Sequence, residues 1–106
     1  MTESIISKNP STLEVIGTDF SLSPEQVRQA FEKAKSAFEI WSTFSYKERG
    51  AYMLRAREYI LDHLDELIDV ISLNNGKAKV DSLSADLLPI CDLLQYFAKK
   101  SEKILE

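Results

Sequence analysis

Apolar residues with helical spacing dominate the chain from residue 23 onward. The first such stretch carries apolar residues three, four and seven positions apart, namely Val27, Ala30, Phe31, Ala34, Ala37, Phe38 and Trp41. Ser23 is a favoured N-cap, Pro24 suits the first helical position, and Gln26 completes a capping box. The pattern therefore predicts an amphipathic helix that begins at Pro24 and extends to about Trp41.

A second helical pattern follows, and the capping box formed by Ser45 and Glu48 marks its beginning. Its apolar positions are Tyr52, Ala56, Tyr59, Ile60, Leu64, Leu67, Ile68 and Ile71. Near residues 62–65 two interpretations are open: one continuous helix, or a break at which Asp62 caps a new helix. Gly76 follows this pattern and suits the left-handed position just past a helix C-terminus.

The last helical pattern runs from about Ala78 to Leu105. Its apolar positions are Val80, Leu83, Leu87, Ile90, Cys91, Leu94, Phe97, Ala98 and Leu105. Pro89 has no backbone N–H, so we expect a kink there rather than a straight helix. Leu88 and Leu93 lie on a second side of the segment. We expect an apolar patch around them that a larger protein would cover, or through which the chain would self-associate.

The first twenty residues favour strands. Residues 5–6 and 14–16 are β-prone, and the Asn-Pro-Ser sequence at residues 9–11 is a turn signal. This order predicts a β-hairpin. Because an isolated two-stranded hairpin is only marginally stable in water, it should pack on the helices or join a sheet supplied from elsewhere.

The composition of the 106 residues, 44% hydrophobic and 28% charged, is that of a soluble globular protein. A formal net charge of −4 argues against nucleic acid or an anionic membrane as a partner. The N-terminus lacks signal-peptide features, and no apolar run reaches the ~18–20 residues of a membrane-spanning helix. The single cysteine, Cys91, cannot form an internal disulfide, which fits a reducing compartment. We therefore expect a cytoplasmic protein.

Few side chains offer catalytic or metal-binding chemistry. Cys91 lies among apolar residues, where a thiol acts as a small buried hydrophobe, so we expect it to be structural. His63 has carboxylates at helical spacing around it, namely Asp62, Asp65, Glu66 and Asp69. Such a cluster suggests a metal, but a di-iron bundle needs a second Glu-x-x-His, which is missing, and a solvated helix face is the commoner explanation. We expect no metal site.

Two other features have structural explanations. Gly76-Lys77 resembles the end of a phosphate-binding loop, but Ile71 stands where its first glycine is required and Ala78 where Ser or Thr is required. Three lysines near the C-terminus complement the helix dipole, namely Lys99, Lys100 and Lys103. Trp41 continues the apolar stripe of the first helix, so we expect it to anchor packing.

A series of short motifs occurs in one order along the whole chain. They are Asn9-Pro10-Ser11-Thr12-Leu13-Glu14-Val15-Ile16-Gly17, Ser23-Pro24-Glu25-Gln26-Val27, Ala37-Phe38 with Trp41, Glu48-Arg49, Gly76-Lys77 and Leu94-Gln95-Tyr96-Phe97-Ala98. In order, spacing and coverage from about Asn9 to Leu105, this series resembles the N-terminal segment of the aldehyde dehydrogenase superfamily. The resemblance implies a mainly α fragment of an α/β fold, with a hairpin arm over residues 1–22 followed by three to four amphipathic helices. Residues 23–106 would be the helical part of an incomplete NAD(P)-binding domain.

The same resemblance implies what the parent enzyme does. It would oxidise an aldehyde to a carboxylic acid with NAD or NADP, through a thioester on a catalytic cysteine that lies far beyond this segment. It implies no catalytic, cofactor-binding or metal-binding residue in this chain and no cofactor bound to it. The segment would be an inactive scaffold whose partner is the remainder of the enzyme.

The chain departs from the family pattern at a few positions. Leu13 stands where relatives usually carry glycine, and Asn74, Asn75 and Ala78 alter a usual Glu-Thr-Gly-Lys-Pro turn. Asp86 falls near a carboxylate that helps hold a structural cation in some members, although a surface or helix-pairing role is favoured. Composition and periodicity alone also permit an alternative, an autonomous helical protein-interaction domain, which gives the hairpin no role.

Overall fold

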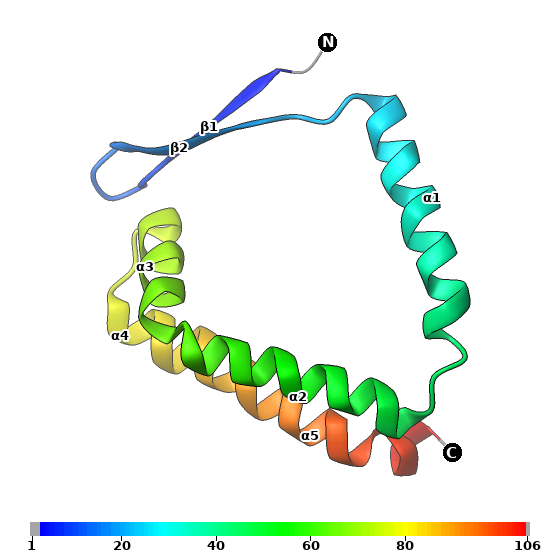
Figure 1. Cartoon of the computed structure of the whole chain (residues 1–106). Helices are drawn as coiled ribbons and strands as arrows, with labels where there is room; N and C mark the ends of the chain where they lie inside the picture. Colours follow the sequence, from blue (N-terminus) through cyan, green and yellow to red (C-terminus); the bar gives the residue numbers. More distant parts are fainter. Residues whose placement is uncertain (1–2, 106) are drawn as a thin grey trace.

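The computed structural model describes residues 3–105, and these form a hairpin followed by helices (Figure 1). The elements in order are β1 (Ser4–Lys8), β2 (Val15–Phe20), α1 (Pro24–Trp41), α2 (Tyr46–Asp62), α3 (Leu64–Asn75), α4 (Lys79–Asp81), the π-helix η1 (Ser82–Leu87) and α5 (Leu88–Leu105). This confirms the predicted fold class, a mainly α chain with an N-terminal β-hairpin.

The hairpin is antiparallel, with Ser4 opposite Phe20 and an irregularity in register between Ser7 and Lys8. Its loop closes through the backbone, since the Leu13 N–H donates to the Asn9 carbonyl at 2.7 Å. Leu13 has φ of 64°, the left-handed region that favours glycine. The loop thus keeps a glycine-like conformation at the position where the family pattern has glycine.

Helix α1 begins where the sequence predicts. Ser23 Oγ accepts the Gln26 backbone N–H at 3.2 Å, and Gln26 Oε1 accepts the Ser23 N–H at 2.8 Å. The helix nevertheless buries none of its residues, and the side chains of Phe31 and Phe38 are 64% and 63% exposed. Figure 1 shows α1 spanning the distance between the hairpin and the start of α2. Its apolar stripe therefore has no covering partner within the described residues.

Helices α2 and α5 lie side by side and antiparallel (Figure 1). They pack closely at Gly50, where a Cβ would lie 2.7 Å from the Ala98 carbonyl oxygen. The α2 face turned toward α5 includes Gly50, Met53, Leu54 and Arg57, whereas Tyr52, Ala56 and Tyr59 are exposed. The predicted stripe is wrong over this first half of α2. Gly50 and Arg57 belong to this face, and neither registers as apolar periodicity.

The helix is interrupted between α2 and α3. Of the two interpretations left open by the sequence, the break is therefore correct and the continuous helix is wrong. Asp62 ends α2 and Leu64 begins α3, with His63 between them at φ −114° and ψ 26°. Asp62 does not cap the new helix, because the N-cap position belongs to His63, which makes no side-chain cap bond. The imidazole instead folds back, with Nδ1 2.9 Å from the Tyr59 carbonyl oxygen.

The irregularity expected at Pro89 occurs just before it. Residues 82–87 form the π-helical turn η1, in which the Leu88 N–H donates to the carbonyl of Leu83 five residues earlier. Pro89 follows directly as the second residue of α5, where it has no backbone N–H to donate to the preceding turn. The core lies around this turn, with Ile68, Ser82, Leu87 and Cys91 buried.

Among the helices described here, none combines the length and the apolar character needed to cross a membrane.

Candidate functional site

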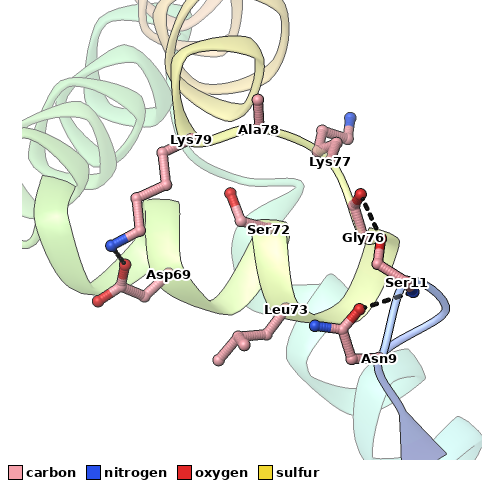
Figure 2. Close-up of a pocket in the computed structure, with 9 residues that line it drawn as sticks. All are labelled: Asn9, Ser11, Asp69, Ser72, Leu73, Gly76, Lys77, Ala78 and Lys79. Carbon is pink, nitrogen blue, oxygen red and sulfur yellow. Dashed lines mark hydrogen bonds and ion pairs between the residues drawn. The ribbon is translucent and has the colours of Figure 1, made fainter. Parts of the chain in front are cut away.

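The most organised polar region is a cleft of about 530 Å³ between the hairpin loop and the turn after α3 (Figure 2). Asn9 and Ser11 contribute from the hairpin, and Ser72 and Leu73 from α3. Asn9 Oδ1 accepts the Ser11 backbone N–H at 2.9 Å, which fixes the loop. The Ser11 hydroxyl then donates to the Gly76 carbonyl at 2.8 Å, so one hydrogen bond joins segments 65 residues apart.

Gly76 is required at this contact for two reasons. It ends α3 in the left-handed conformation, φ 67° and ψ 22°, which confirms the predicted C-terminal position. A Cβ there would also lie 2.5 Å from Ser11 Oγ and 2.9 Å from Pro10 Cγ. The Gly76-Lys77 motif thus serves to seat the hairpin on the helical turn.

Two ion pairs border the cleft. Lys77 Nζ lies 2.7 Å from Asp86 Oδ2, and Lys79 Nζ lies 2.8 Å from Asp69 Oδ1. The hydrogen bond that Lys79 donates to Asp69, and then the negative charge of Asp69, raise the pKa of Lys79 above its ordinary value. Each ammonium is thereby neutralised by a neighbour. Both lysines at this cleft therefore have a carboxylate partner.

A buried polar contact stands behind this turn. Ser82 is fully buried in η1, and its hydroxyl lies 2.7 Å from that of Ser72 in α3. Because a buried hydroxyl without a partner costs free energy, this pair explains why two serines are tolerated in the core. Sequence periodicity gave no sign of the contact, since serine is usually taken as a surface residue.

The residues considered for chemistry are scattered. Cys91 is a free thiol, 4% exposed, in the small core, which agrees with a packing role. The His63 ring stacks on Tyr59 with centroids 3.9 Å apart. Asp62, Asp65, Glu66 and Asp69 are exposed, and no group of three or more potential ligands converges within the described residues. Asp86, near the position of a structural-cation carboxylate in some relatives, is paired with Lys77.

Trp41 is partly buried at the joint between α1 and α2. Its ring lies 5.7 Å from Phe44 and 5.2 Å from Tyr52, centroid to centroid. An apolar cleft of about 590 Å³ opens beside this cluster, lined also by Ala34 and Phe38. Trp41 therefore packs against the joint, while the remainder of its stripe is exposed.

The sequence patterns did not indicate Arg49 as a candidate functional residue. It lies on the α2 face near α5, where its Nε is buried without a hydrogen-bond partner among the described residues. Its guanidinium lies over the Tyr46 ring, 4.7 Å from the centroid. In the sequence, Arg49 stands out only as part of the Glu48-Arg49 motif. That motif indicates the family resemblance but no functional role for this residue.

Comparison with known proteins gives one consistent result. Residues 1–106 match the aldehyde dehydrogenase family. A betaine aldehyde dehydrogenase of Vibrio vulnificus (strain YJ016) is 33% identical over 96 residues, which are 91% of this chain and 20% of that protein. A D-glyceraldehyde dehydrogenase (NADP(+)) of Picrophilus torridus is 32% identical over 102 residues, 96% of this chain and 20% of that protein.

A succinate semialdehyde dehydrogenase of Acinetobacter baylyi is 27% identical over 96 residues, again 91% of this chain and 20% of the relative. The chain thus spans about a fifth of the length of these curated relatives. The hairpin, the two capping boxes and the Gly76 turn carry the sequence motifs that first suggested the relationship. The chain belongs to the aldehyde dehydrogenase family.

Proposed function

We propose that this chain is the N-terminal scaffold portion of an NAD(P)-dependent aldehyde dehydrogenase. The parent enzyme would oxidise an aldehyde to a carboxylic acid through a thioester on a cysteine outside these residues. Family membership and the activities in the relatives' names support this proposal. In it, residues 1–22 are the hairpin arm and residues 23–106 the helical part of the cofactor-binding domain of a cytoplasmic enzyme.

The observation that carries the proposal is the uncovered surface of α1. A compact chain of this length has a radius of gyration of about 13 Å, whereas the value here is 17.7 Å, with extents of 48 × 39 × 21 Å. An amphipathic helix is stabilised mainly by burying its apolar face, yet α1 buries no residue. The remainder of the enzyme is the partner that such a face requires.

The hairpin supports the same conclusion. Its two strands pair only with each other among residues 3–105, so within this range each has an edge without a neighbouring strand. A sheet of this size is marginal alone, and unpaired edges favour addition of further strands. The alternative, an autonomous helical interaction domain, gives these strands no role.

No residue of this segment is proposed to act in the reaction or to hold NAD(P). Cys91 is buried among apolar side chains, whereas a nucleophilic thiolate needs an electropositive and partly open environment. The nicotinamide supplies hydride-accepting chemistry in the parent enzyme. The contribution of these residues is to hold the cofactor-binding domain in shape.

The reading frame downstream of codon 106 tests the proposal directly. A glycine-rich strand-turn-helix followed by a cysteine-bearing motif is expected, and the longer product should reduce NAD or NADP in the presence of aldehydes. The 106-residue chain assayed alongside should give no reduced cofactor above a blank without protein. A longer product that turns over no aldehyde would contradict the proposal, as would turnover by the short chain that Cys91→Ala abolishes.

A further inference from the structure

Arg49 lies at the end of a cleft of about 240 Å³ between α2 and α5. Aromatic and aliphatic side chains line most of it, including Trp41, Tyr46, Phe97 and Leu105. Ser101 also lines it and donates its hydroxyl to the Phe97 carbonyl within α5. Arg49 therefore supplies the only cationic group among the residues described around this cleft.

The guanidinium is incompletely satisfied. Its Nε is buried and has no partner among residues 3–105, and none of the ion pairs formed by these residues includes Arg49. The Tyr46 ring faces the guanidinium plane at 4.7 Å but cannot accept the in-plane Nε–H. Burying a charged donor without an acceptor is unfavourable, so the position calls for an acceptor from outside the described residues.

The shape and charge of the position select the acceptor. A guanidinium presents N–H groups in a planar fork that matches a carboxylate with two parallel hydrogen bonds. The apolar walls strengthen such a pair by excluding water. A carboxylate on an apolar stem fits this cleft better than a neutral group or a free solvated ion.

The path of the chain indicates where the carboxylate comes from. Leu105, the last residue of α5, lines the same cleft as Arg49, and Figure 1 shows the end of α5 beside the start of α2. Polypeptide leaving α5 therefore starts at the cleft mouth. The family relatives are about five times as long as this chain, so a substantial segment follows in them.

We propose that Arg49 binds a side-chain carboxylate from the polypeptide that follows residue 106, and so locks the α2–α5 pair to the next part of the enzyme. This inference rests on the proposed function, because it requires that the enzyme continues beyond α5. Arg49 is a positioning residue in this account and touches neither substrate nor cofactor.

The first test uses the 106-residue chain and a small probe. Trp41, the single tryptophan, lines the cleft and reports occupancy by fluorescence. Phenylacetate should bind about tenfold more tightly than its neutral isostere phenylacetamide, as expected for a hydrogen-bonded charge pair. Arg49→Met should abolish that preference. Arg55→Met should preserve it, since Arg55 makes a comparable contact with the Tyr52 ring, 4.5 Å to the centroid, outside this cleft. Equal affinity for both probes would overturn the carboxylate assignment.

The second test compares Arg49→Met in the short chain and in the longer product. The melting temperature of the short chain should stay unchanged or rise, because an unsatisfied donor is removed, whereas that of the longer product should fall by several degrees. Arg55→Met should change neither. A longer product that oxidises aldehydes but tolerates Arg49→Met would overturn this inference alone. A longer product without activity would overturn the proposed function and leave the probe result standing.

Glu106 lies outside the described residues, and its variant distinguishes the remaining source of a carboxylate. Glu106→Gln in the short chain should leave both probe affinity and melting temperature unchanged. If it lowers the melting temperature and cancels the effect of Arg49→Met, Glu106 is the acceptor and the downstream assignment is wrong.

Discussion

Leu13 is a single residue whose backbone conformation fits the family pattern. Among residues 3–105 it is the non-glycine residue with a positive φ, 64°, and its side chain is largely exposed. A side chain with a Cβ pays about 1–2 kcal/mol in the left-handed region. The loop therefore has a glycine-like conformation at the position where the family resemblance implies glycine.

Replacing this residue by glycine should stabilise the hairpin. Leu13→Gly relieves about 1–2 kcal/mol of strain and loses about 0.4–1 kcal/mol to the greater freedom of the unfolded chain, for a net gain of roughly 0.5–1 kcal/mol. Urea unfolding measures the difference. Leu13→Ala keeps the strained φ and serves as control, with little expected change. A glycine variant no more stable than the alanine variant would show that the loop is unstrained.

Gly50 is the second position where a single atom decides packing. Alanine there gains up to about 1 kcal/mol in helix propensity but forces its Cβ against the Ala98 carbonyl, for an expected net loss of about 1–2 kcal/mol. A Cβ at Gly17 would meet nothing within 4 Å, so Gly17→Ala is a matched control without a clash. Thermal melts of the two variants should diverge. A Gly50→Ala protein as stable as the parent would show that α2 and α5 shift apart freely.

The residues that sequence analysis identified correctly act locally. Ser23, Ser45 and Gly76 satisfy backbone groups within four residues of themselves, so their neighbours in sequence are sufficient to predict them. Gly50 meets Ala98 of α5, and Arg49 lines a cleft together with α5 residues, in both cases about fifty residues away. No local pattern carries that information, which is why both were missed.

At the scale of elements, helix ends were easier to predict than helix faces. Both capping boxes and the hairpin turn occur where predicted, whereas the α2 face toward α5 is displaced from the predicted stripe. Tyr52 and Tyr59 belong to that stripe by hydrophobicity, but their rings lie outside the α2–α5 contact. The side of a helix that is buried depends on the helix that packs against it. The residues of that second helix lie elsewhere in the sequence.

Both helix starts carry a carboxylate with a lowered pKa, Glu25 in α1 through its hydrogen bond with Arg28 and Glu48 in α2, but only in α2 does that carboxylate belong to the capping box. Two hydrogen bonds with Ser45 lower the pKa of Glu48 below its ordinary value. The larger effect comes from the Ser45 backbone N–H and the smaller one from the Ser45 side chain. A group with a lowered folded pKa contributes stability above its unfolded pKa, about 4.3, and loses it as pH falls through the folded value. Helical content followed by circular dichroism should therefore decrease below about pH 4.

The two capping boxes supply reciprocal controls. Glu48→Gln keeps the cap but removes the titrating group, so it should flatten this part of the acid titration. Gln26→Glu in α1 should introduce a new acid-sensitive step, because Gln26 occupies the equivalent cap position. Identical titrations of parent and Glu48→Gln would rule out this carboxylate as the source.

The joint between α1 and α2 depends on Trp41. Because this ring is only partly buried, Trp41→Ala should cost about 1–3 kcal/mol, mostly through lost contact with Phe44 and Tyr52, less than the 3–5 kcal/mol of a fully buried tryptophan. Phe31→Ala removes an exposed ring from the same stripe and should change stability by less than about 0.5 kcal/mol. Equal melting temperatures for the two variants would place Trp41 outside the stabilising contacts.

At the scale of the whole molecule, the features that depend on contacts between distant segments were not predicted from the sequence. The hairpin, the succession of helices and the family relationship were all predicted, because each rests on local periodicity or motif order. The open placement of α1, the π-helical turn before Pro89 and the docking of Ser11 on Gly76 were not. These depend on which surfaces meet in space. Leu88 and Leu93, around which an apolar patch was expected, are 42% and 54% exposed.

The exposed α1 face should make the isolated chain associate with itself. Phe31 and Phe38 together leave about 250 Å² of ring surface in water, roughly 6 kcal/mol of unrealised burial as an upper bound. That is a large fraction of a domain's net stability. The isolated chain should therefore self-associate as its concentration rises and bind a hydrophobic dye, both of which sedimentation velocity and dye fluorescence detect.

Substitutions on α1 test whether this apolar face, rather than the rest of the surface, causes the association and the dye binding. The double variant Phe31→Glu with Phe38→Glu should suppress dye binding and association. Lys35→Glu shifts the net charge by the same two units on the polar side of α1, and it should leave both intact if the apolar face is responsible. Equal suppression by the two variants would assign association to net charge. A parent chain that stays monomeric and binds no dye would mean that α1 closes onto the other helices in solution, and the autonomous-domain alternative would gain support.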